Sequence, residues 1–411
     1  FLAATAAAAH LPLFGSEQAP PTAASILARI RAPKFPSRVF DITRYGARPD
    51  GKTLATQAIA DAIAACAKAG GGTVRVPAGV FLTGSIHLKS NVNLNVAKGA
   101  TLLFSTDPKD YLPVVLTRFE SLECYNYSPL IYALDQTNIA VTGEGTLDGQ
   151  GTAAAWWPWK GNKKYGWKPG MPNQLAARKA LGDMGEKDVP VKDRVFGDGH
   201  YLRPTFLQPY RCTNVLIEGI TIRNSPMWEV NPVLSSNVIV RDVKIDTHGP
   251  NNDGCDPESS KDVLIEGCLF NTGDDCIAIK SGRNRDGRRA NVPCENIIIR
   301  NCSFQDGHGG VTIGSEVSGN VRNVFVEDCR MDSPLLGRAL RLKTNSYRGG
   351  IIENVYLHNV TIGQVSEAIA GADFYYEEGE GGPFPPTLRN VVLEKVTCKK
   401  CQYALLFRGY K

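Results

Sequence analysis

The sequence predicts an all-β protein folded as a right-handed parallel β-helix, a solenoid with an N-terminal capping helix. A phrase of Asn or Asp followed by alternating apolar residues recurs at spacings of 23 to 36 residues. Gly, Asn and Asp turns separate the copies, and no helical segment lies between them. The copies start at Asn214, Asn237, Asp262, Asn296, Asn323, Asn354 and Asn390, with weaker copies at Asn91 and Asn138.

The period within each copy supports this fold. Apolar residues alternate with a period of two, as in strands, whereas helical repeats would show a period of about 3.6. The L-x-x-L-x-L frame of leucine-rich repeats is absent. Cys268, Cys302 and Cys329 each follow the first residue of a copy by six positions. We expect them to stack as a ladder of small buried thiols, without disulfides or metal.

Two segments interrupt the repeat. Residues 56–69 place apolar side chains at helical spacing before three glycines, which predicts the helix that caps the solenoid. Residues 152–200 contain four of the five tryptophans, and we expect a long loop that closes one end of a cleft. We therefore divide the chain into an N-terminal extension, 1–37, and one β-helix domain, 38–411.

Composition restricts the class of protein. The 411 residues are 43% hydrophobic and 21% charged, which excludes a disordered chain and a coiled coil. A net charge of +5 is too small to indicate a nucleic-acid partner, and no long apolar run predicts a membrane span. The apolar start, residues 1–10, resembles the end of a secretory signal, so we expect a secreted protein. We also expect a monomer.

Titratable residues recur at matching places on neighbouring coils. Three strands end on a serine, and the residue seven places earlier is acidic or a histidine. These residues are Asp253, Asp274 and His308, counted back from Ser260, Ser281 and Ser315. Equivalent positions of a parallel β-helix stack about 4.8 Å apart, so we expect one column, with Asp275 beside it.

Cations share the same predicted face. Arg341 and Lys343 are two residues apart on one strand and therefore point to one side, and Lys280 matches Lys343 by the same counting. Residues 283–289 add four arginines and one aspartate. The sequence thus predicts carboxylates, an imidazole and several cations on one outward face.

The carboxylates suggest an acid and a base. Asp274 lies between Asp253 and Asp275, and like charges this close cannot all ionise easily, so we expect Asp274 to keep a proton. A protonated carboxyl beside ionised ones suits glycoside hydrolysis, which needs an acid for the leaving oxygen and a base for water. Arg341 and Lys343 would pair with a carboxylate on the sugar.

The motifs that contain these residues resemble those of the polygalacturonases, glycoside hydrolase family 28, and of its exo-acting bacterial members. The motifs are NNDGCD at 251–256, GDD at 273–275, GHG at 307–309 and RLK at 341–343, and the resemblance extends from about Asp41 to the end. Two positions differ from the family pattern: Asn252 replaces the usual Thr, and Cys255 replaces an apolar residue or Gly.

The resemblance implies a role for each residue. Asp274 would be the general acid, Asp253 and Asp275 would serve the water with inversion, and His308 would support the acid. Arg341 and Lys343 would hold galacturonate at the cleaved subsite. Further candidates for substrate binding are Lys280, Asn251 and Asp256. No metal or cofactor is expected.

We therefore expect exo-acting hydrolysis of α-1,4 bonds between galacturonates in pectin, with the polysaccharide as the partner. Alternatives are a rhamnogalacturonan or xylogalacturonan hydrolase, a calcium-dependent pectate lyase and a non-catalytic carbohydrate-binding β-helix. A lyase would use the aspartates as calcium ligands. A simple column would place Asp253 and Asp274 nearer the roughly 5 Å of a retaining pair than the roughly 6.5–9.5 Å of an inverting one.

Overall fold

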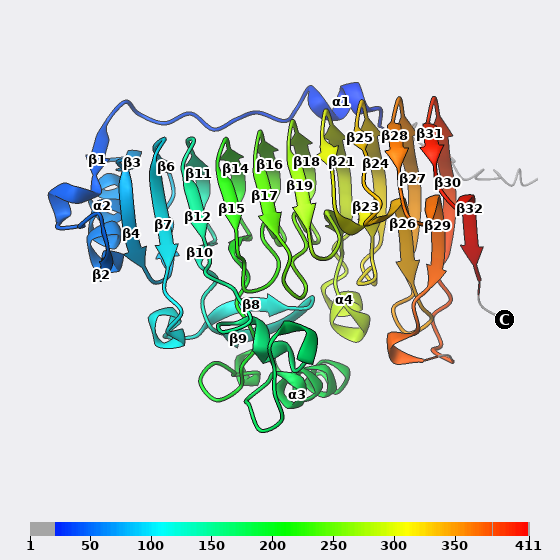
Figure 1. Ribbon diagram of the computed structural model, residues 1–411, viewed down its shortest axis with the longest axis horizontal. Coiled ribbons are helices and arrows are strands. Elements are labelled where there is room, and N and C mark those ends of the chain that lie inside the picture. The colour runs from blue at the N-terminus through cyan, green and yellow to red at the C-terminus, as the bar shows by residue number, and fades with distance from the viewer. Residues whose placement is uncertain (1–20, 380, 410–411) are drawn as a thin grey trace, which may run out of the picture.

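The computed structural model describes residues 21–379 and 381–409, which form a right-handed parallel β-helix (Figure 1). The predicted fold class is therefore confirmed. Each coil contributes short strands to stacked parallel sheets, and each strand pairs with its equivalents on the coils before and after it. Backbone hydrogen bonds thus run along the stack, while side chains point into the core or out to solvent.

Two sheets of 11 strands extend along the described part of the chain. The strands of the first are β1 (Val39–Asp41), β3 (Gly72–Val76), β6 (Val92–Val96), β11 (Thr137–Thr142), β14 (Thr213–Glu218), β16 (Ser236–Arg241), β18 (Lys261–Glu266), β21 (Cys294–Arg300), β24 (Val321–Glu327), β27 (Ile351–His358) and β30 (Thr387–Glu394). The strands of the second are β2 (Asp50–Leu54), β4 (Gly79–Thr83), β7 (Ala100–Phe104), β12 (Thr146–Asp148), β15 (Thr221–Arg223), β17 (Lys244–Thr247), β19 (Leu269–Thr272), β22 (Ser303–Phe304), β25 (Arg330–Met331), β28 (Thr361–Gln364) and β31 (Thr397–Lys400).

A third face carries the site. Its first sheet contains β5 (Ile86–His87), β10 (Ile131–Leu134) and β13 (Leu207–Tyr210), and its second contains β20 (Ile277–Ile279), β23 (Gly307–Ile313), β26 (Leu336–Thr344), β29 (Ala368–Phe374) and β32 (Tyr403–Arg408). Single parallel bridges connect the two sheets through Val230 and Cys255. Each coil therefore contributes to three faces.

The repeated phrase spans two of these faces. The copy from Asn214 forms β14, turns at Gly219 and continues as β15 in the next sheet. The strand predicted after each copy belongs to the third face. Buried side chains such as Phe270 and Phe304, whose rings stack with centroids 5.4 Å apart, fill the space between the faces.

The first residues of the copies form an amide ladder. All nine have φ between +50° and +65°, which Asn and Asp tolerate better than other residues with a Cβ. Asn side chains donate from coil to coil, as from Asn214 to Asn138 at 2.8 Å and from Asn237 to Asn214 at 2.7 Å. Asp262 has no side-chain N–H, and no such bond joins it to Asn237.

The N-terminal extension docks at this gap. Two nitrogens of the Arg29 guanidinium donate to Asp262 at 2.7 and 2.9 Å, and the amide N–H of Arg31 donates to the Asn237 side chain at 2.9 Å. Helix α1 (Ala23–Leu27) packs Ile26 on an outward apolar column of the first sheet. Figure 1 shows this segment following one edge of the stack back to β1. Residues 1–10, read as a signal remnant, lie outside the described residues.

The predicted capping helix is present as α2 (Thr56–Lys68), and it buries Ile59, Ile63 and Cys66 against the first coils. The predicted loop at 152–200 is wrong in one respect, because it contains α3 (Leu175–Glu186) and three 3-10 turns. These are η3 (Trp157–Lys160), η4 (Lys163–Tyr165) and η5 (Val191–Asp193). Leu181 makes this helix possible by packing into a small core with Phe119 and Trp228.

Two more excursions lie on the same side as α3. The antiparallel hairpin of β8 (Val115–Phe119) and β9 (Leu122–Asn126) and helix α4 (Asn284–Ala290) project from one edge of the stack (Figure 1). The remaining short turns are η1 (Ile42–Tyr45), η2 (Pro108–Tyr111) and η6 (Tyr376–Glu378). The excursions form a wall beside the third face.

All eleven cysteines are free. Cys268, Cys302 and Cys329 are buried at the corner between the first two sheets, which confirms the predicted thiol ladder. Among the described residues, no helix is long and apolar enough to cross a membrane.

Candidate active site

The predicted column is correct on one side and shifted by one residue on the other. Ile277 pairs with Val311, which places Asp274 level with His308 as expected. However, Cys255 pairs with Ile277 and Glu258 with Lys280, so Asp253 is level with Asp275 and not with Asp274. The two serines used for counting differ, because Ser260 leads directly into β18 whereas Ser281 leads into the excursion with α4.

The three carboxylates nevertheless cluster. Asp253, Asp274 and Asp275 each offer an oxygen within 4.8 Å of the others. Asp253 and Asp275 are buried, whereas the side chain of Asp274 keeps 18% of its surface exposed. Asp274 is therefore the carboxyl of this cluster that an incoming sugar reaches first.

Asp274 and His308 form a hydrogen-bonded pair. The distance between His308 Nδ1 and Asp274 Oδ1 is 2.9 Å, and the His308 side chain is 57% exposed. Burial alone would raise the pKa of Asp274, but the hydrogen bond to His308 and the positive charges of His308, Lys343 and Lys280 lower it. The same hydrogen bond raises the pKa of His308.

The retained proton is therefore not on Asp274, contrary to the sequence-based expectation. Burial and the charges of Asp256 and Asp274 raise the pKa of Asp253 well above its ordinary value. Burial also raises the pKa of Asp256, to about 7, against the opposing charge of Lys280. The raised pKa values favour a proton on this buried pair over one on Asp274, because Asp253 and Asp256 lack the exposure of Asp274 and its hydrogen bond to His308.

The predicted cations have different surroundings. Lys343 Nζ donates to Asp275 at 2.7 Å, and Thr312 donates to the other oxygen of Asp275 at 2.8 Å. Arg341 lies 3.8 Å from Asp275 and 3.4 Å from Asp373, and its side chain keeps 20% of its surface exposed. Arg341 is therefore placed to meet a sugar carboxylate, while Lys343 is occupied by Asp275.

Lys280 and Asp256 do not meet their predicted role of direct substrate contact. Lys280 is 2% exposed and lies 3.4 Å from Asp253, 3.5 Å from Asp256 and 3.7 Å from Glu316. Its Nζ also lies 4.6 Å from the ring centroid of Trp228. Asp256 is 0% exposed. Both groups are buried beside Asp253 on neighbouring coils, so they affect the charge of the cluster from its buried side.

Asn251, another predicted binding residue, holds two cations that the sequence analysis did not include. Its Oδ1 accepts from Lys160 Nζ at 2.7 Å and from Arg203 at 2.9 Å. Lys160 ends η3, so the insertion reaches the catalytic face. A lone Glu in an apolar stretch, Glu229, was also missed; it is fully buried beside Asp253 and Asp256, and burial raises its pKa well above its usual range.

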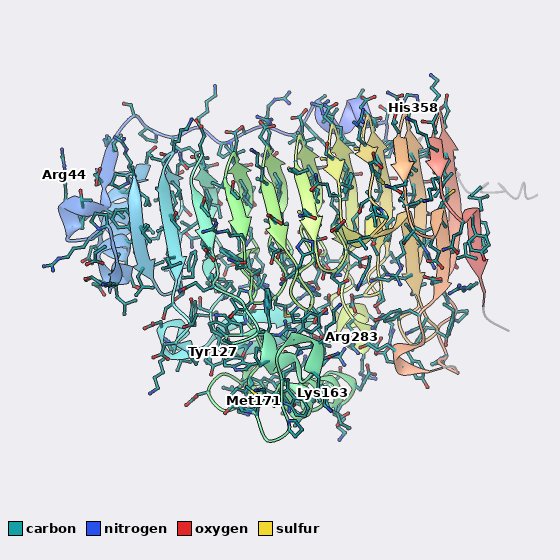
Figure 2. The ribbon with its side chains drawn as sticks, in the orientation of Figure 1. Arg44, Tyr127, Lys163, Met171, Arg283 and His358 are labelled. Carbon is teal, nitrogen blue, oxygen red and sulfur yellow. The ribbon has the colours of Figure 1, made fainter. Side chains whose placement is uncertain are left out.

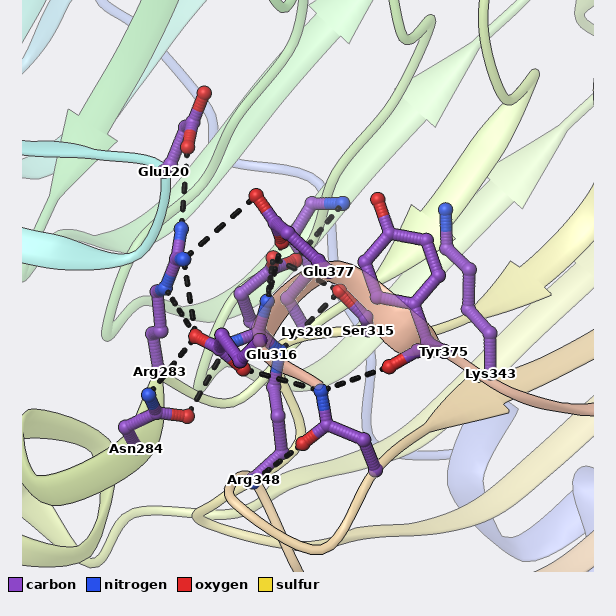
Figure 3. A network of polar contacts seen from close by, with 12 residues as sticks. Glu120, Lys280, Arg283, Asn284, Ser315, Glu316, Lys343, Arg348, Tyr375 and Glu377 are labelled. Atoms are coloured by element: carbon purple, nitrogen blue, oxygen red, sulfur yellow. Dashed lines mark hydrogen bonds and ion pairs between the residues drawn. The ribbon is translucent and has the colours of Figure 1, made fainter. Parts of the chain in front are cut away.

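An ion-pair network joins the excursions beside the site (Figure 3). Arg348 donates to Glu378 at 2.7 Å and to Glu377 at 2.8 Å, and Arg283 contacts Glu378 at 3.0 Å and Glu120 at 3.1 Å. Arg283 of the predicted cationic segment is therefore paired with carboxylates. The hairpin, α4 and the loop after β29 share these pairs, which fix the wall in place.

The three aspartates are close enough to hold a metal ion, but donors already face their oxygens. Lys343 and Thr312 occupy Asp275, His308 occupies Asp274, and Lys280 lies beside Asp253. A carboxylate cage for a divalent cation would exclude such ammonium groups. The arrangement fits carboxylates that share protons better than it fits calcium ligands.

Comparisons with known proteins identify the family. The family model for glycosyl hydrolases family 28 matches residues 194–404, about half of the chain, and includes all four site motifs. The chain belongs to this family. A second model, described as rhamnogalacturonase A/epimerase, pectate lyase-like, matches residues 39–99.

Family 28 relatives agree along most of the chain. A solved exopolygalacturonase from Thermotoga maritima is 50% identical with a TM-score of 0.92, over 95% of this chain and 87% of that chain. A probable polygalacturonase of Vitis vinifera is 31% identical over 77% of this chain and 59% of its own length. An endo-polygalacturonase of Pectobacterium parmentieri is 31% identical over 87% and 79%. The chain thus spans about three fifths of the Vitis relative.

Proposed function

We propose that this family 28 protein hydrolyses α-1,4 bonds between galacturonates in polygalacturonate and releases products from a chain end. The observation that carries the proposal is the 2.9 Å hydrogen bond between His308 and the exposed Asp274, at the edge of a buried carboxylate cluster. Arg341 beside this pair supplies a cation for a sugar carboxylate. The likeness to the Thermotoga exopolygalacturonase supports the substrate and the exo mode.

The residues divide the reaction between them. Asp274 passes a proton to the leaving oxygen, and His308 supplies this proton through the 2.9 Å bond, because the pKa of Asp274 is lowered and that of His308 is raised. Asp275, hydrogen-bonded by Lys343, accepts a proton from the attacking water, while Thr312 fixes its orientation. Asp253 lies level with Asp275 and helps to hold the same water.

We propose that the insertion at 152–200 favours the exo mode by blocking one end of the path of the substrate. Trp156 does not serve as a sugar platform, because it packs edge-on against Tyr111 and Trp159, with centroids 5.5 and 5.0 Å away. Trp157 donates to the carbonyl of Ser225 at 2.9 Å, and Lys160 bonds to Asn251 at 2.7 Å. These contacts anchor the insertion on the coils that carry the site.

Product analysis tests this function. Chromatography of polygalacturonate digests should show monomer or dimer from the first time point, with viscosity falling in step with reducing sugar. Early trimers to hexamers would contradict the exo mode. Rhamnogalacturonan and xylogalacturonan should be poor substrates, and faster cleavage of either would replace the proposed substrate.

The same digests exclude a lyase or a binding protein. EDTA should leave the rate unchanged, and no absorbance from an unsaturated product should appear. Activity that is lost in EDTA, together with unsaturated product, would identify a calcium-dependent lyase. Binding without any product would indicate a non-catalytic solenoid. In each case Asp274→Asn serves as the inactive control.

We also propose that the protein acts outside the cell and as a monomer. The support is the size of the proposed substrate, a polymer that must be shortened before it can enter a cell. Fractionation of an expressing culture should recover the activity in the medium or periplasm. Size-exclusion chromatography with light scattering should give one chain of 44.5 kDa, and a larger mass would contradict the monomer.

A further inference from the structure

Two cations beside the catalytic cluster have no carboxylate partner. Lys160 Nζ donates to Asn251 Oδ1 at 2.7 Å, and the Arg203 guanidinium donates to the same oxygen at 2.9 Å. The other partners of Arg203 are neutral: the side chain of Gln174 at 3.0 Å and the carbonyls of Pro226 and Pro250 at 2.8 and 2.6 Å. Within residues 21–379 and 381–409, neither cation has an ion pair.

This lack of an anion is unusual for the molecule. The buried guanidiniums of Arg118, Arg194 and Arg348 each have a carboxylate oxygen within 3.0 Å. Arg203 is only 1% exposed, and its burial lowers its pKa to about 10. A buried cation without an anion costs free energy, so a ligand that brings negative charge to this place is stabilised.

The nearby carboxylates are already bound elsewhere. The charge of Glu120 raises the pKa of Lys160, but Glu120 accepts from Arg178 at 2.6 Å and from Arg283 at 3.1 Å. The charge of Asp274 acts in the same direction, and Asp274 is paired with His308. Of the three N–H groups of Lys160, one is used by Asn251, which leaves two for a ligand.

The place of Lys160 and Arg203 along the stack puts their positive charge on one side of the scissile bond. Asn251 precedes Asp274 by one coil, whereas Arg341 follows His308 by one coil. The two cationic places therefore lie on opposite sides of Asp274 along the axis of the β-helix. A galacturonan that crosses Asp274 would present one carboxylate to each.

We propose that Lys160 binds the carboxylate of the sugar on the side of the scissile bond opposite to Arg341, and that Arg203 positions Lys160 through Asn251. The inference rests on the proposed function and extends it: the insertion supplies charge recognition as well as a barrier. An exo-acting enzyme with such a place would require an unesterified galacturonate on both sides of the cleaved bond.

Digalacturonate and its two mono-methyl esters test this inference. The wild-type protein should cleave digalacturonate, with a free carboxylate on both sugars, faster than either mono-methyl ester. Lys160→Met should abolish the preference at one sugar and raise KM for digalacturonate about tenfold or more, with a small change in kcat. Arg341→Gln should abolish the preference at the other sugar. Lys160→Arg should restore part of it, because the charge is kept.

Lys163→Met is the matched control, since Lys163 is an exposed lysine of the same insertion and is labelled in Figure 2. It should leave both preferences unchanged. If Lys160→Met keeps both preferences, or lowers the rate on all three substrates equally while the melting temperature falls, the inference is wrong. A wild-type protein that cleaves no galacturonide would instead contradict the proposed function.

Discussion

Asp256→Asn would remove a carboxyl group that is 0% exposed. Burial is the largest cause that raises the pKa of this carboxyl from its ordinary value of 3.8 to about 7. Between these two pH values the folded protein keeps a proton on Asp256 that the unfolded chain releases. The contribution of Asp256 to stability is therefore complete below pH 3.8 and is lost as the pH rises towards 7.

The size of this effect follows from the shift. A difference of 7 − 3.8 at 1.36 kcal/mol per pH unit gives about 4 kcal/mol. An unfolding entropy of about 2.1 cal/mol/K per residue over 411 residues converts this to about 5 °C in melting temperature. Asn cannot release a proton, so the variant lacks this loss.

The assay is thermal unfolding of wild type and Asp256→Asn at pH 4 and pH 8. The difference in melting temperature, variant minus wild type, should be about 5 °C more positive at pH 8. Asp183→Asn, at an exposed aspartate paired with Lys179, should show little change at either pH. An Asp256 difference that is equal at both pH values would refute the reasoning, because it would mean that Lys280 keeps the carboxyl ionised throughout.

Asp274→Asn should lower kcat by about 10²–10⁴-fold with little change in KM, and more than a tenth of the wild-type kcat would show that Asp274 is not the acid. Lys343→Met should lower kcat, since Asp275 loses the 2.7 Å partner that orients it; an unchanged kcat would contradict this role for Lys343. The resemblance predicts inversion, so proton NMR should show the β-anomer first, and an initial α-anomer would mean that the close carboxylates act as a retaining pair. Dithiothreitol should leave the melting temperature unchanged because all eleven cysteines are free, and a decrease would reveal a disulfide.

The repeated strand pattern in the sequence was enough to predict most of the fold. Alternating residues after each Asn are enough to predict stacked strands. The regular step between Asp274 and His308 survives because His308 belongs to β23 and Asp274 lies shortly before β20, the strand that pairs with β23. The step from Asp253 to Asp274 failed by one residue. The chain leaves the coil after Ser281 to form α4, and the sequence does not show where such an excursion begins.

The sequence predicted less of the chemistry of the site. The sequence placed three aspartates together but could not show which one is open to solvent, and this decides where the proton is held. Lys160 and Asn251 are 91 residues apart, so no local pattern links them. A signal for the docked extension did exist: the outward positions Leu216, Ile239 and Leu264 are apolar, and a solvent-facing column of this kind usually has a cover.

The docked N-terminal extension changes how the protein should unfold. In a solenoid each coil touches only its neighbours, so one end can unfold while the middle remains intact. Here Ile26 and Ile30 rest on a column that extends from Ala140 to Phe325, and Arg29 takes the place of the amide that Asp262 lacks. The extension that carries Ile26 and Arg29 can dock only after coils more than 230 residues later have formed. Unfolding of the N-terminal coils would therefore disturb the contacts that the extension makes with the middle of the stack. For this reason the coils should unfold as one cooperative unit.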